Sequence, residues 1–251
     1  GNVMWVGLGD VNGDAQTEVV VSCENWHFYC LDAKGTDLWS FEVEHAGQEG
    51  ALGDLKGDGK LETLCGQEYY GWDVLDSTGK RLYVVSGPGP ISTAALCADL
   101  NGDGKDEAVF GAQTCGIYVR DGAGNRVLDA NVGGFVTDLT TLRGPQGTLL
   151  VASAESHDFN LAAFRSDGSA AWRRQLSGVP LMLAACGDSV AVGCDDGLLQ
   201  LVDARGQVTP LLHLSGAVRN VATADVYGDG QTEILATGDR ELVAVKLPPK
   251  G

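Results

Sequence analysis

Four nine-residue stretches carry a high density of oxygen-bearing side chains. The third, residues 99–107, reads DLNGDGKDE and places Asp99, Asn101 and Asp103 at alternate positions, with Glu107 four residues further on. Carboxylate and amide oxygens at this spacing suit calcium, a hard cation that takes about six to eight oxygen ligands, backbone carbonyls included. The sequence therefore predicts a calcium loop closed by the carbonyl of Lys105 and the carboxylate of Glu107.

The same pattern occurs three more times in the chain. Residues 10–18 read DVNGDAQTE, residues 54–62 read DLKGDGKLE and residues 225–233 read DVYGDGQTE. Asp and Asn also cap turns without any metal, but four copies that all end in glutamate favour the metal interpretation. The predicted ligands, with the seventh position acting through its carbonyl, are Asp10, Asn12, Asp14, Gln16 and Glu18; Asp54, Asp58, Lys60 and Glu62; Asp99, Asn101, Asp103, Lys105 and Glu107; and Asp225, Asp229, Gln231 and Glu233.

The four stretches differ at positions that affect metal binding. Ala15 replaces the glycine of the other three copies, and a left-handed backbone there costs about 1 kcal/mol. Lys56 stands where an oxygen ligand belongs, and its ammonium is able to replace the ion among the carboxylates of its own stretch. Tyr227 offers no oxygen at the same position, so we expect water to fill that vertex and calcium affinity to fall.

A second periodic feature is a glycine turn followed four residues later by a large side chain. The first periodic feature, the acidic stretch, begins at residues 10, 54, 99 and 225, and its first two intervals are 44 and 45 residues. Short alternating apolar runs bounded by Gly, Asp and Asn lie between the two features and predict β-strands. The paired positions of the turn are Gly35 and Trp39, Gly79 and Tyr83, Gly124 and Leu128, Gly168 and Trp172, and Gly206 and Pro210.

A four-stranded unit of about 44 residues that repeats along a chain is typical of a β-propeller, whose blades must pack on one another to bury a core. We predict an all-β fold of about six blades of four-stranded antiparallel sheet in a single domain over residues 1–251. The last blade is incomplete, so we expect a segment of a longer protein, or a ring closed by packing of inner strands. The predicted blades are residues 3–46, 47–90, 91–134, 135–178, 179–216 and 217–251.

The acidic stretches resemble the calcium loops of the FG-GAP family of propeller repeats, which is integrin-α-like and also known as VCBS repeats. The strings GDVNGDAQTEVVV, ADLNGDGKDEAVF and ADVYGDGQTEILA carry the likeness, which covers nearly the whole chain. The glycine turn with Trp is similar to the outer strand of quinoprotein-type repeats. The resemblance implies calcium as a structural cofactor and an extracellular, periplasmic or cell-surface location.

Composition excludes some partners. The net charge is −17, and 13 of the 34 acidic residues lie in the four acidic stretches, so nucleic acid and anionic membranes are poor partners. No apolar run is long enough to predict membrane insertion. The seven cysteines follow no metal-binding pattern, and most lie among apolar strand residues, where a thiol acts as a small apolar group. Seven unpaired thiols weaken the extracellular expectation.

The face opposite the acidic loops is predicted to bind a ligand. Trp26, His27, Tyr69 and Tyr70 come from adjacent repeats and gather aromatic rings on one sector, with Asn25, Gln67 and Glu68 nearby. Rings with neighbouring polar groups suit a glycan or a protein. We expect Trp72 to pack between blades instead. The oligomeric state is left open.

Catalysis has a narrower basis in the sequence. No nucleophile elbow, zinc-type histidine spacing or phosphate loop occurs. A polysaccharide lyase needs a base such as His or Tyr, and His27 or His45 with Tyr69 would supply one. The preferred interpretation is a calcium-stabilised binding module with no assigned catalytic residue, and a catalytic or substrate-positioning domain of a polysaccharide lyase is the alternative.

Overall fold

The computed structural model describes residues 1–69, 71–86 and 92–247. These residues form 23 β-strands, and no helix in them is long and apolar enough to span a membrane. Tyr70, one of the predicted ligand-binding residues, lies outside the described residues.

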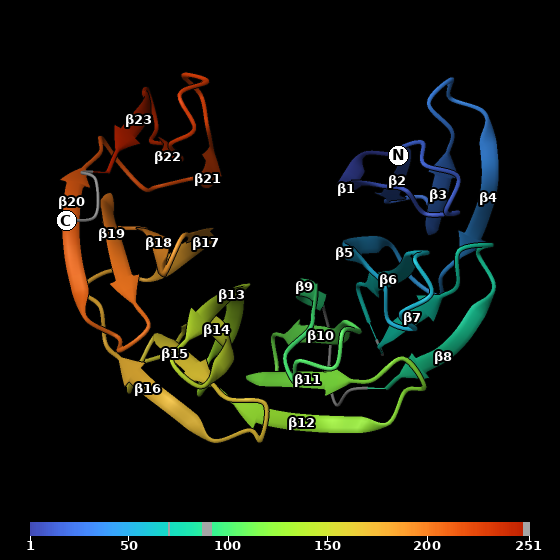
Figure 1. The fold of residues 1–251 in the computed structure, drawn as a ribbon, viewed down its shortest axis with the longest axis horizontal. Coiled ribbons are helices and arrows are strands. Elements are labelled where there is room, and N and C mark those ends of the chain that lie inside the picture. The colour runs from blue at the N-terminus through green and yellow to red at the C-terminus, as the bar shows by residue number, and fades with distance from the viewer. Residues whose placement is uncertain (70, 87–91, 248–251) are drawn as a thin grey trace. The chain divides into compact units, whose positions relative to one another are not determined.

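The chain divides into two compact units, Gly1–Asn131 and Val132–Gly251. Unit 1 contains three four-stranded antiparallel sheets, each in sequence order (Figure 1). Blade 1 is β1 (Val3–Gly9), β2 (Glu18–Cys23), β3 (His27–Leu31) and β4 (Asp37–Glu42). Blade 2 is β5 (Gly47–Gly53), β6 (Glu62–Gln67), β7 (Trp72–Leu75) and β8 (Arg81–Val85). Blade 3 is β9 (Ser92–Ala98), β10 (Glu107–Ala112), β11 (Gly116–Arg120) and β12 (Arg126–Asn131).

Unit 2 contains two four-stranded sheets and one three-stranded sheet. Blade 4 is β13 (Phe135–Gly144), β14 (Gly147–Glu155), β15 (Leu161–Phe164) and β16 (Ala170–Arg174). Blade 5 is β17 (Pro180–Cys186), β18 (Ser189–Cys194), β19 (Leu198–Asp203) and β20 (Val208–His213). Blade 6 is β21 (Asn220–Ala224), β22 (Glu233–Thr237) and β23 (Leu242–Lys246). The predicted all-β propeller fold of about six blades is confirmed; in the described residues the last sheet has three strands, and each sheet falls inside one predicted repeat range.

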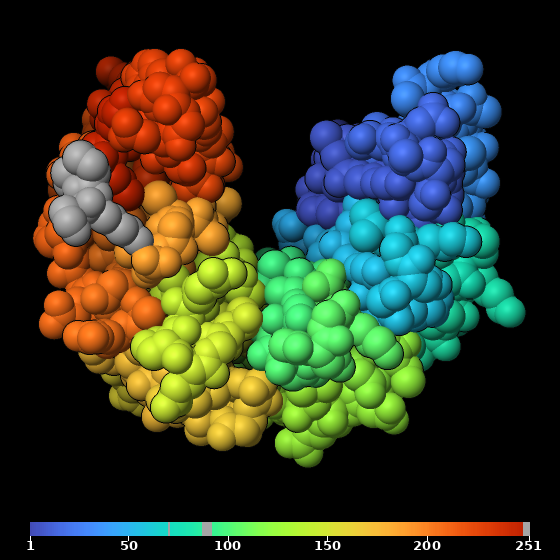
Figure 2. Space-filling model, in the orientation of Figure 1, coloured from blue at the N-terminus to red at the C-terminus, as the bar shows by residue number. Residues whose placement is uncertain are grey.

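The apolar core of each unit lies between consecutive blades. The first strands of neighbouring blades contact each other, β1 with β5 and β5 with β9 in unit 1, and β13 with β17 and β17 with β21 in unit 2. Trp72 is buried and lies 5.0 Å from Phe110 of the next blade, ring centroid to ring centroid, as predicted for a packing residue. In the space-filling view the blades within each unit are in direct contact (Figure 2). A single blade therefore depends on its neighbour to bury its apolar face.

The glycine turn and its aromatic residue form a link between consecutive blades, which we call the blade staple. Trp39 Nε1 donates a hydrogen bond to the carbonyl of Ser77 in blade 2, at 3.2 Å. The Trp39 ring lies against Gly79, where a Cβ atom would come within 2.8 Å of the ring. Glycine recurs in these turns because its φ is positive, as at Gly35 (81°) and Gly79 (79°), and at Gly79 the ring of the preceding blade also occupies the space that a side chain would need.

The blade staple occurs twice more within the units. The Tyr83 hydroxyl donates to the carbonyl of Asp121 at 3.0 Å, and Trp172 Nε1 donates to the carbonyl of Ala204 at 3.2 Å. The two periodic sequence features therefore have different structural roles. The acidic stretches join the first and second strands of a blade, and the glycine turns join the third and fourth strands while receiving the ring of the blade before.

Candidate functional site

The four acidic stretches form similar compact loops, here named loop 1 (residues 10–18), loop 2 (54–62), loop 3 (99–107) and loop 4 (225–233). In loop 1 the Asp10 carboxylate accepts hydrogen bonds from the backbone N–H groups of Gly13 at 2.8 Å and Ala15 at 2.8 Å. The closing glutamate of each loop is buried. Glu18 accepts from the N–H of Val11 at 2.8 Å. These bonds curl the loop so that its carboxylates face one another.

Loop 1 brings three carboxylates close together. One oxygen from each of Asp10, Asp14 and Glu18 lies within 4.8 Å of the others. Ala15 has a φ of 65°, so the predicted left-handed backbone at this position is confirmed. A cation would relieve the repulsion between three negative groups held at this separation. The donor set is all oxygen and fits calcium.

Loop 3 has the full set of predicted oxygen ligands. Asp99 accepts from the N–H groups of Gly102 at 2.6 Å and Gly104 at 2.9 Å. Asn101 Nδ2 donates to Glu107 Oε1 at 2.7 Å, so the positive end of the amide dipole lies against the buried carboxylate. Burial is the largest cause that raises the pKa of Glu107. Loop 3 has no lysine at its third position, and its neutral Asn101 amide would have to turn its oxygen toward Glu107 to serve as a cation ligand.

Loop 2 contains a lysine at the position predicted to compete with calcium. Lys56 Nζ lies 2.8 Å from Glu62 Oε1 and donates a hydrogen bond to it. Burial is the largest cause that raises the pKa of Glu62, and the Lys56 ammonium opposes it. The ammonium therefore takes the place on the closing glutamate that a cation would need, as the sequence predicted.

Loop 4 is partly neutralised by a lysine that sequence reasoning missed. Lys246, on β23, forms an ion pair with Asp229, and its ammonium lies 5.8 Å from the centre of the Tyr227 ring. Glu233 Oε1 is buried and has no hydrogen-bond partner among the described residues. An orphaned carboxylate oxygen fits a cation, while the pairing of Asp229 with Lys246 opposes one.

Loops 1, 2 and 3 are connected through their backbones. The N–H of Leu61 in loop 2 donates to the carbonyl of Val11 in loop 1 at 3.2 Å. The N–H of Asp106 in loop 3 donates to the carbonyl of Asp54 in loop 2 at 3.0 Å, and the N–H of Asp54 donates back to the Asp106 carboxylate at 3.0 Å. The three loops of unit 1 therefore lie side by side.

The turns at the other end of these strands bring three aromatic rings together, named here the aromatic cluster: Trp26, His45 and Tyr69. The ring centroids of Trp26 and His45 are 5.9 Å apart, and those of His45 and Tyr69 are 5.0 Å apart. Trp26 is 48% exposed and Tyr69 39% exposed. Trp26 has a φ of 69°, an unfavourable value for a residue with a large side chain. The cluster therefore holds exposed apolar surface on a strained turn.

The structure distributes the other predicted ligand-binding residues differently. His27 stacks on Tyr29 at 5.6 Å, ring centroid to ring centroid, and its Nδ1 lies 2.9 Å from the carbonyl of Asn25. His45 takes part in the cluster, although the sequence suggested it only as a base for a lyase. The sequence signal for its place in the cluster was the position of His45 between the first and second predicted blades.

Gln67 is not available to a ligand. It is buried, and its Oε1 accepts hydrogen bonds from the N–H groups of Glu44 at 2.9 Å and His45 at 3.2 Å. Gln67, which the sequence places near the aromatic residues, therefore has its side-chain oxygen occupied by backbone donors. The residue holds the connection between blades 1 and 2, which positions His45.

All seven cysteines are free thiols. Cys23 pairs across the sheet with His27, which confirms that it does not face Cys30. Burial raises the pKa of the Cys30 thiol to about 12. The buried thiols pack as small apolar groups and are poor nucleophiles in the folded chain.

Comparisons with known proteins identify the fold. No protein-family model matches the chain, and no curated protein matches it. Among solved structures, the chain is similar to BBS1N in complex with ARL6DN, in a crystal soaked with lead, with a TM-score of 0.74, 14% identity and coverage of 100% of this chain and 84% of that chain. The mercury-soaked crystal of the same complex gives a TM-score of 0.74 at 15% identity, with 98% and 82% covered.

Sqt1 from Saccharomyces cerevisiae is also similar, with a TM-score of 0.81, 13% identity and coverage of 98% of this chain and 73% of that chain. These structures are β-propellers. At such low identity the likeness supports the fold alone, and it agrees with the six sheets of the chain.

Proposed function

We propose that the chain is a calcium-stabilised β-propeller that binds a partner protein through the aromatic cluster. The observation that carries the proposal is the exposed Trp26 side chain on a backbone with a φ of 69°. A positive φ of this kind costs about 1–2 kcal/mol, and it recurs at Cys115 (66°) in the same turn of blade 3, so the exposed ring and not the backbone distinguishes Trp26. One of the similar structures, BBS1N, was solved in complex with ARL6DN, which is consistent with a protein partner.

A protein partner suits the cluster better than a glycan. The ring planes of Trp26 and His45 make an angle of 50°, and those of His45 and Tyr69 make an angle of 74°, so the three rings do not form the flat surface on which a sugar ring would stack. Gln67, one of the two amide side chains that the sequence places near the rings, accepts hydrogen bonds from the backbone instead. Exposed Trp and Tyr side chains are the groups that most often dominate binding energy in protein interfaces.

Paired affinity purification tests this assignment. The immobilised wild-type chain is compared with a W26G/Y69S double variant and with L242S, which changes an exposed apolar residue outside the cluster. Leu38 is not used as the control because it lines a pocket with Asp14 and Glu18 of loop 1. We expect proteins retained by the wild type and by L242S to be lost from the double variant. An identical set of retained proteins on all three chains would refute the role of the cluster, and a glycan-array signal lost only from the double variant would reassign the ligand to a glycan.

For the calcium sites, we propose that loops 1 and 3 bind the ion, with Asp10, Asp14 and Glu18 in one, and Asp99, Asp103 and Glu107 in the other. Bound calcium supplies positive charge that neutralises these carboxylates. Since the unfolded chain lacks the loops, binding adds to folding stability, by about 2.7 kcal/mol when free calcium is about 100 times Kd. Lys56 and Lys246 each pair with a carboxylate of their loop, so we expect loops 2 and 4 to bind calcium more weakly.

Calorimetric titration of chelator-treated protein tests the sites. We expect about two ions per chain, one fewer in each of D14N and D103N, and a lower melting temperature in excess chelator. A melting temperature that is the same with calcium and with chelator would contradict the stabilising role. A dissociation constant of about 10⁻⁴–10⁻³ M, the range of extracellular modules, would support the proposed location outside the cytoplasm.

A polysaccharide lyase is less well supported. His45 lies beside Tyr69 as that alternative requires, but the neighbouring residues Glu44 and Glu68 are acidic, and like charge would repel a uronate substrate. An assay for unsaturated uronate products separates the two functions.

A further inference from the structure

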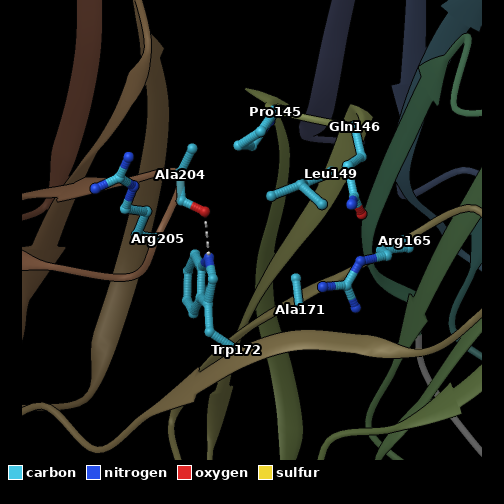
Figure 3. Close-up of a pocket in the computed structure, with 8 residues that line it drawn as sticks. All are labelled: Pro145, Gln146, Leu149, Arg165, Ala171, Trp172, Ala204 and Arg205. Atoms are coloured by element: carbon cyan, nitrogen blue, oxygen red, sulfur yellow. Dashed lines mark hydrogen bonds between the residues drawn. The ribbon is translucent and has the colours of Figure 1, made fainter.

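A separate pocket lies in unit 2, on the side of blades 4 and 5 where the acidic loops would be. It has a volume of about 370 Å³, within the range of about 300–1,000 Å³ that ligand sites occupy. Leu149, Ala171 and Trp172 supply apolar surface, Arg165 reaches in from one side and Arg205 lies on the other (Figure 3). We call this site the arginine pocket; its remaining lining residues are Pro145, Gln146 and Ala204.

Blade 4 lacks an acidic loop at the arginine pocket, whereas a pocket of about 390 Å³ at the corresponding place between blades 2 and 3 is walled by Leu55, Lys56 and Asp103 of such loops. The first two strands of blade 4, β13 and β14, are joined by the short turn Gly144–Gly147, where blades 1, 2, 3 and 6 carry nine-residue acidic stretches. The short turn leaves the surface beside β16 uncovered. The staple residue Trp172 forms the floor, fixed by its hydrogen bond to the carbonyl of Ala204 at 3.2 Å. The pocket is therefore built on rigid strand and staple geometry.

The two arginines of this region form no ion pair, as is also true of Arg143, Arg173, Arg174 and Arg240 among the described residues. Arg81, Arg120, Arg126 and Arg219 each form an ion pair with an aspartate. In the described part of the chain, no carboxylate lies within ion-pair distance of Arg165 or Arg205, although the net charge is −17. Arg165 Nη1 donates to Ser169 Oγ at 3.2 Å and to the carbonyl of Ala170 at 3.1 Å, which holds its guanidinium in place.

We propose that the arginine pocket binds an acidic segment of a partner protein, with one large apolar side chain on the Trp172 floor and flanking carboxylates on Arg165 and Arg205. Planar guanidinium groups bind carboxylates through paired hydrogen bonds. The apolar floor requires a side chain as well as a charge. A polyanion such as nucleic acid is disfavoured because the rest of the chain repels it, whereas a segment with two or three carboxylates meets the pocket locally. The site is independent of the aromatic cluster, which lies in unit 1.

The probe is a dye-labelled peptide, acetyl-Gly-Asp-Glu-Phe-Glu-Asp-Gly-amide, titrated against the whole chain by fluorescence anisotropy. The double variant R165Q/R205Q should weaken binding by about ten-fold or more, equivalent to at least about 1.4 kcal/mol. The control R240Q removes the charge of an exposed arginine elsewhere in unit 2 and should leave the affinity within about two-fold. Replacing Phe with Ser in the peptide should weaken binding to the wild type, since the apolar contact is lost.

A site-specific signal separates pocket binding from general electrostatic attraction. The chain has five tryptophans, and the indole N–H resonance of Trp172 is assigned by its loss in W172F. We expect the peptide to shift the Trp172 resonance and leave that of Trp39, the staple residue of blade 1, in place. Equal binding by R165Q/R205Q and R240Q, an unmoved Trp172 resonance, no binding at millimolar peptide, or equal affinity for inorganic polyphosphate would each overturn the proposal.

Discussion

The blade staple gives a quantitative prediction, because two equivalent glycine turns in unit 1 differ in a single respect. Gly35 has a φ of +81°, and no atom lies within 4 Å of the point that an added Cβ would occupy. Gly79 has a φ of +79°, and a Cβ there would lie 2.8 Å from the Trp39 ring. Alanine at either position must adopt a left-handed backbone, which costs about 1 kcal/mol. Only at Gly79 does it also collide with a ring.

The expected loss of stability follows from these two contributions. G35A should lower the free energy of unfolding by about 1 kcal/mol. G79A adds an overpacking cost of about 1–3 kcal/mol, so its total should be about 2–4 kcal/mol. In a W39A background the ring is absent but the Cβ of residue 39 stays 3.0 Å from the added Cβ, so the cost of G79A should fall below its wild-type value and remain above that of G35A.

Urea denaturation followed by far-ultraviolet circular dichroism measures the free energy of unfolding of the wild type and of G35A, G79A, W39A and W39A/G79A, with calcium held constant so that loop occupancy does not change between samples. The double-mutant cycle isolates the contact between Trp39 and Gly79 from the loss of the Trp39 hydrogen bond to Ser77. If G79A and G35A destabilise the chain equally, or if G79A costs as much in the W39A background as in the wild type, the staple does not exert the steric constraint described above.

Three further predictions concern the turn, the loops and a buried acid. W26G should leave the free energy of unfolding unchanged or raise it by up to about 1 kcal/mol, because glycine tolerates the φ of 69°, while partner binding is lost; a large destabilisation in urea would contradict this. K56N should raise the number of calcium ions bound per chain by about one, because it removes the ammonium from Glu62 and gives loop 2 the same third-position ligand as loop 3. An unchanged number in calorimetric titration would show that loop 2 fails to bind calcium for another reason. Burial raises the pKa of Asp138 to about 6, from an ordinary 3.8, so its contribution to stability is present below about pH 4 and is lost as the pH rises through 6. D138N should therefore reduce the fall in stability between pH 4 and pH 6.5 by about 2 kcal/mol, and parallel wild-type and variant denaturation series in chelator would show the same pH slope if that reasoning is mistaken.

Local features were predictable from the sequence because they depend on neighbouring residues. The left-handed backbone of Ala15 follows from its place in the repeat, and the pairing of Cys23 with His27 follows from the turn between them. The placement of Lys56 on its own loop is likewise a short-range effect, six residues from Glu62.

Features that depend on packing between strands or blades were not predictable from the residue pattern. Lys246 reaches Asp229 from β23, 17 residues further along the chain, and nothing in either local pattern indicates the pairing. The role of Gln67 depends on a connection 22 and 23 residues earlier. The arginine pocket combines the short turn of blade 4 with two arginines 40 residues apart, which periodicity alone does not bring together.

The buried thiols described above give the chain its own reporters of local opening. Alkylating reagents attack the thiolate, which the raised pKa values of Cys30, Cys65 and Cys194 suppress in the folded state. These cysteines lie in blades 1, 2 and 5, so each is modified only when its own blade unfolds far enough to admit the reagent. Mass spectrometry of timed alkylation would therefore rank the blades by their rates of local unfolding in the unaltered protein. It would also show which blade unfolds more slowly when an ion or a partner is added.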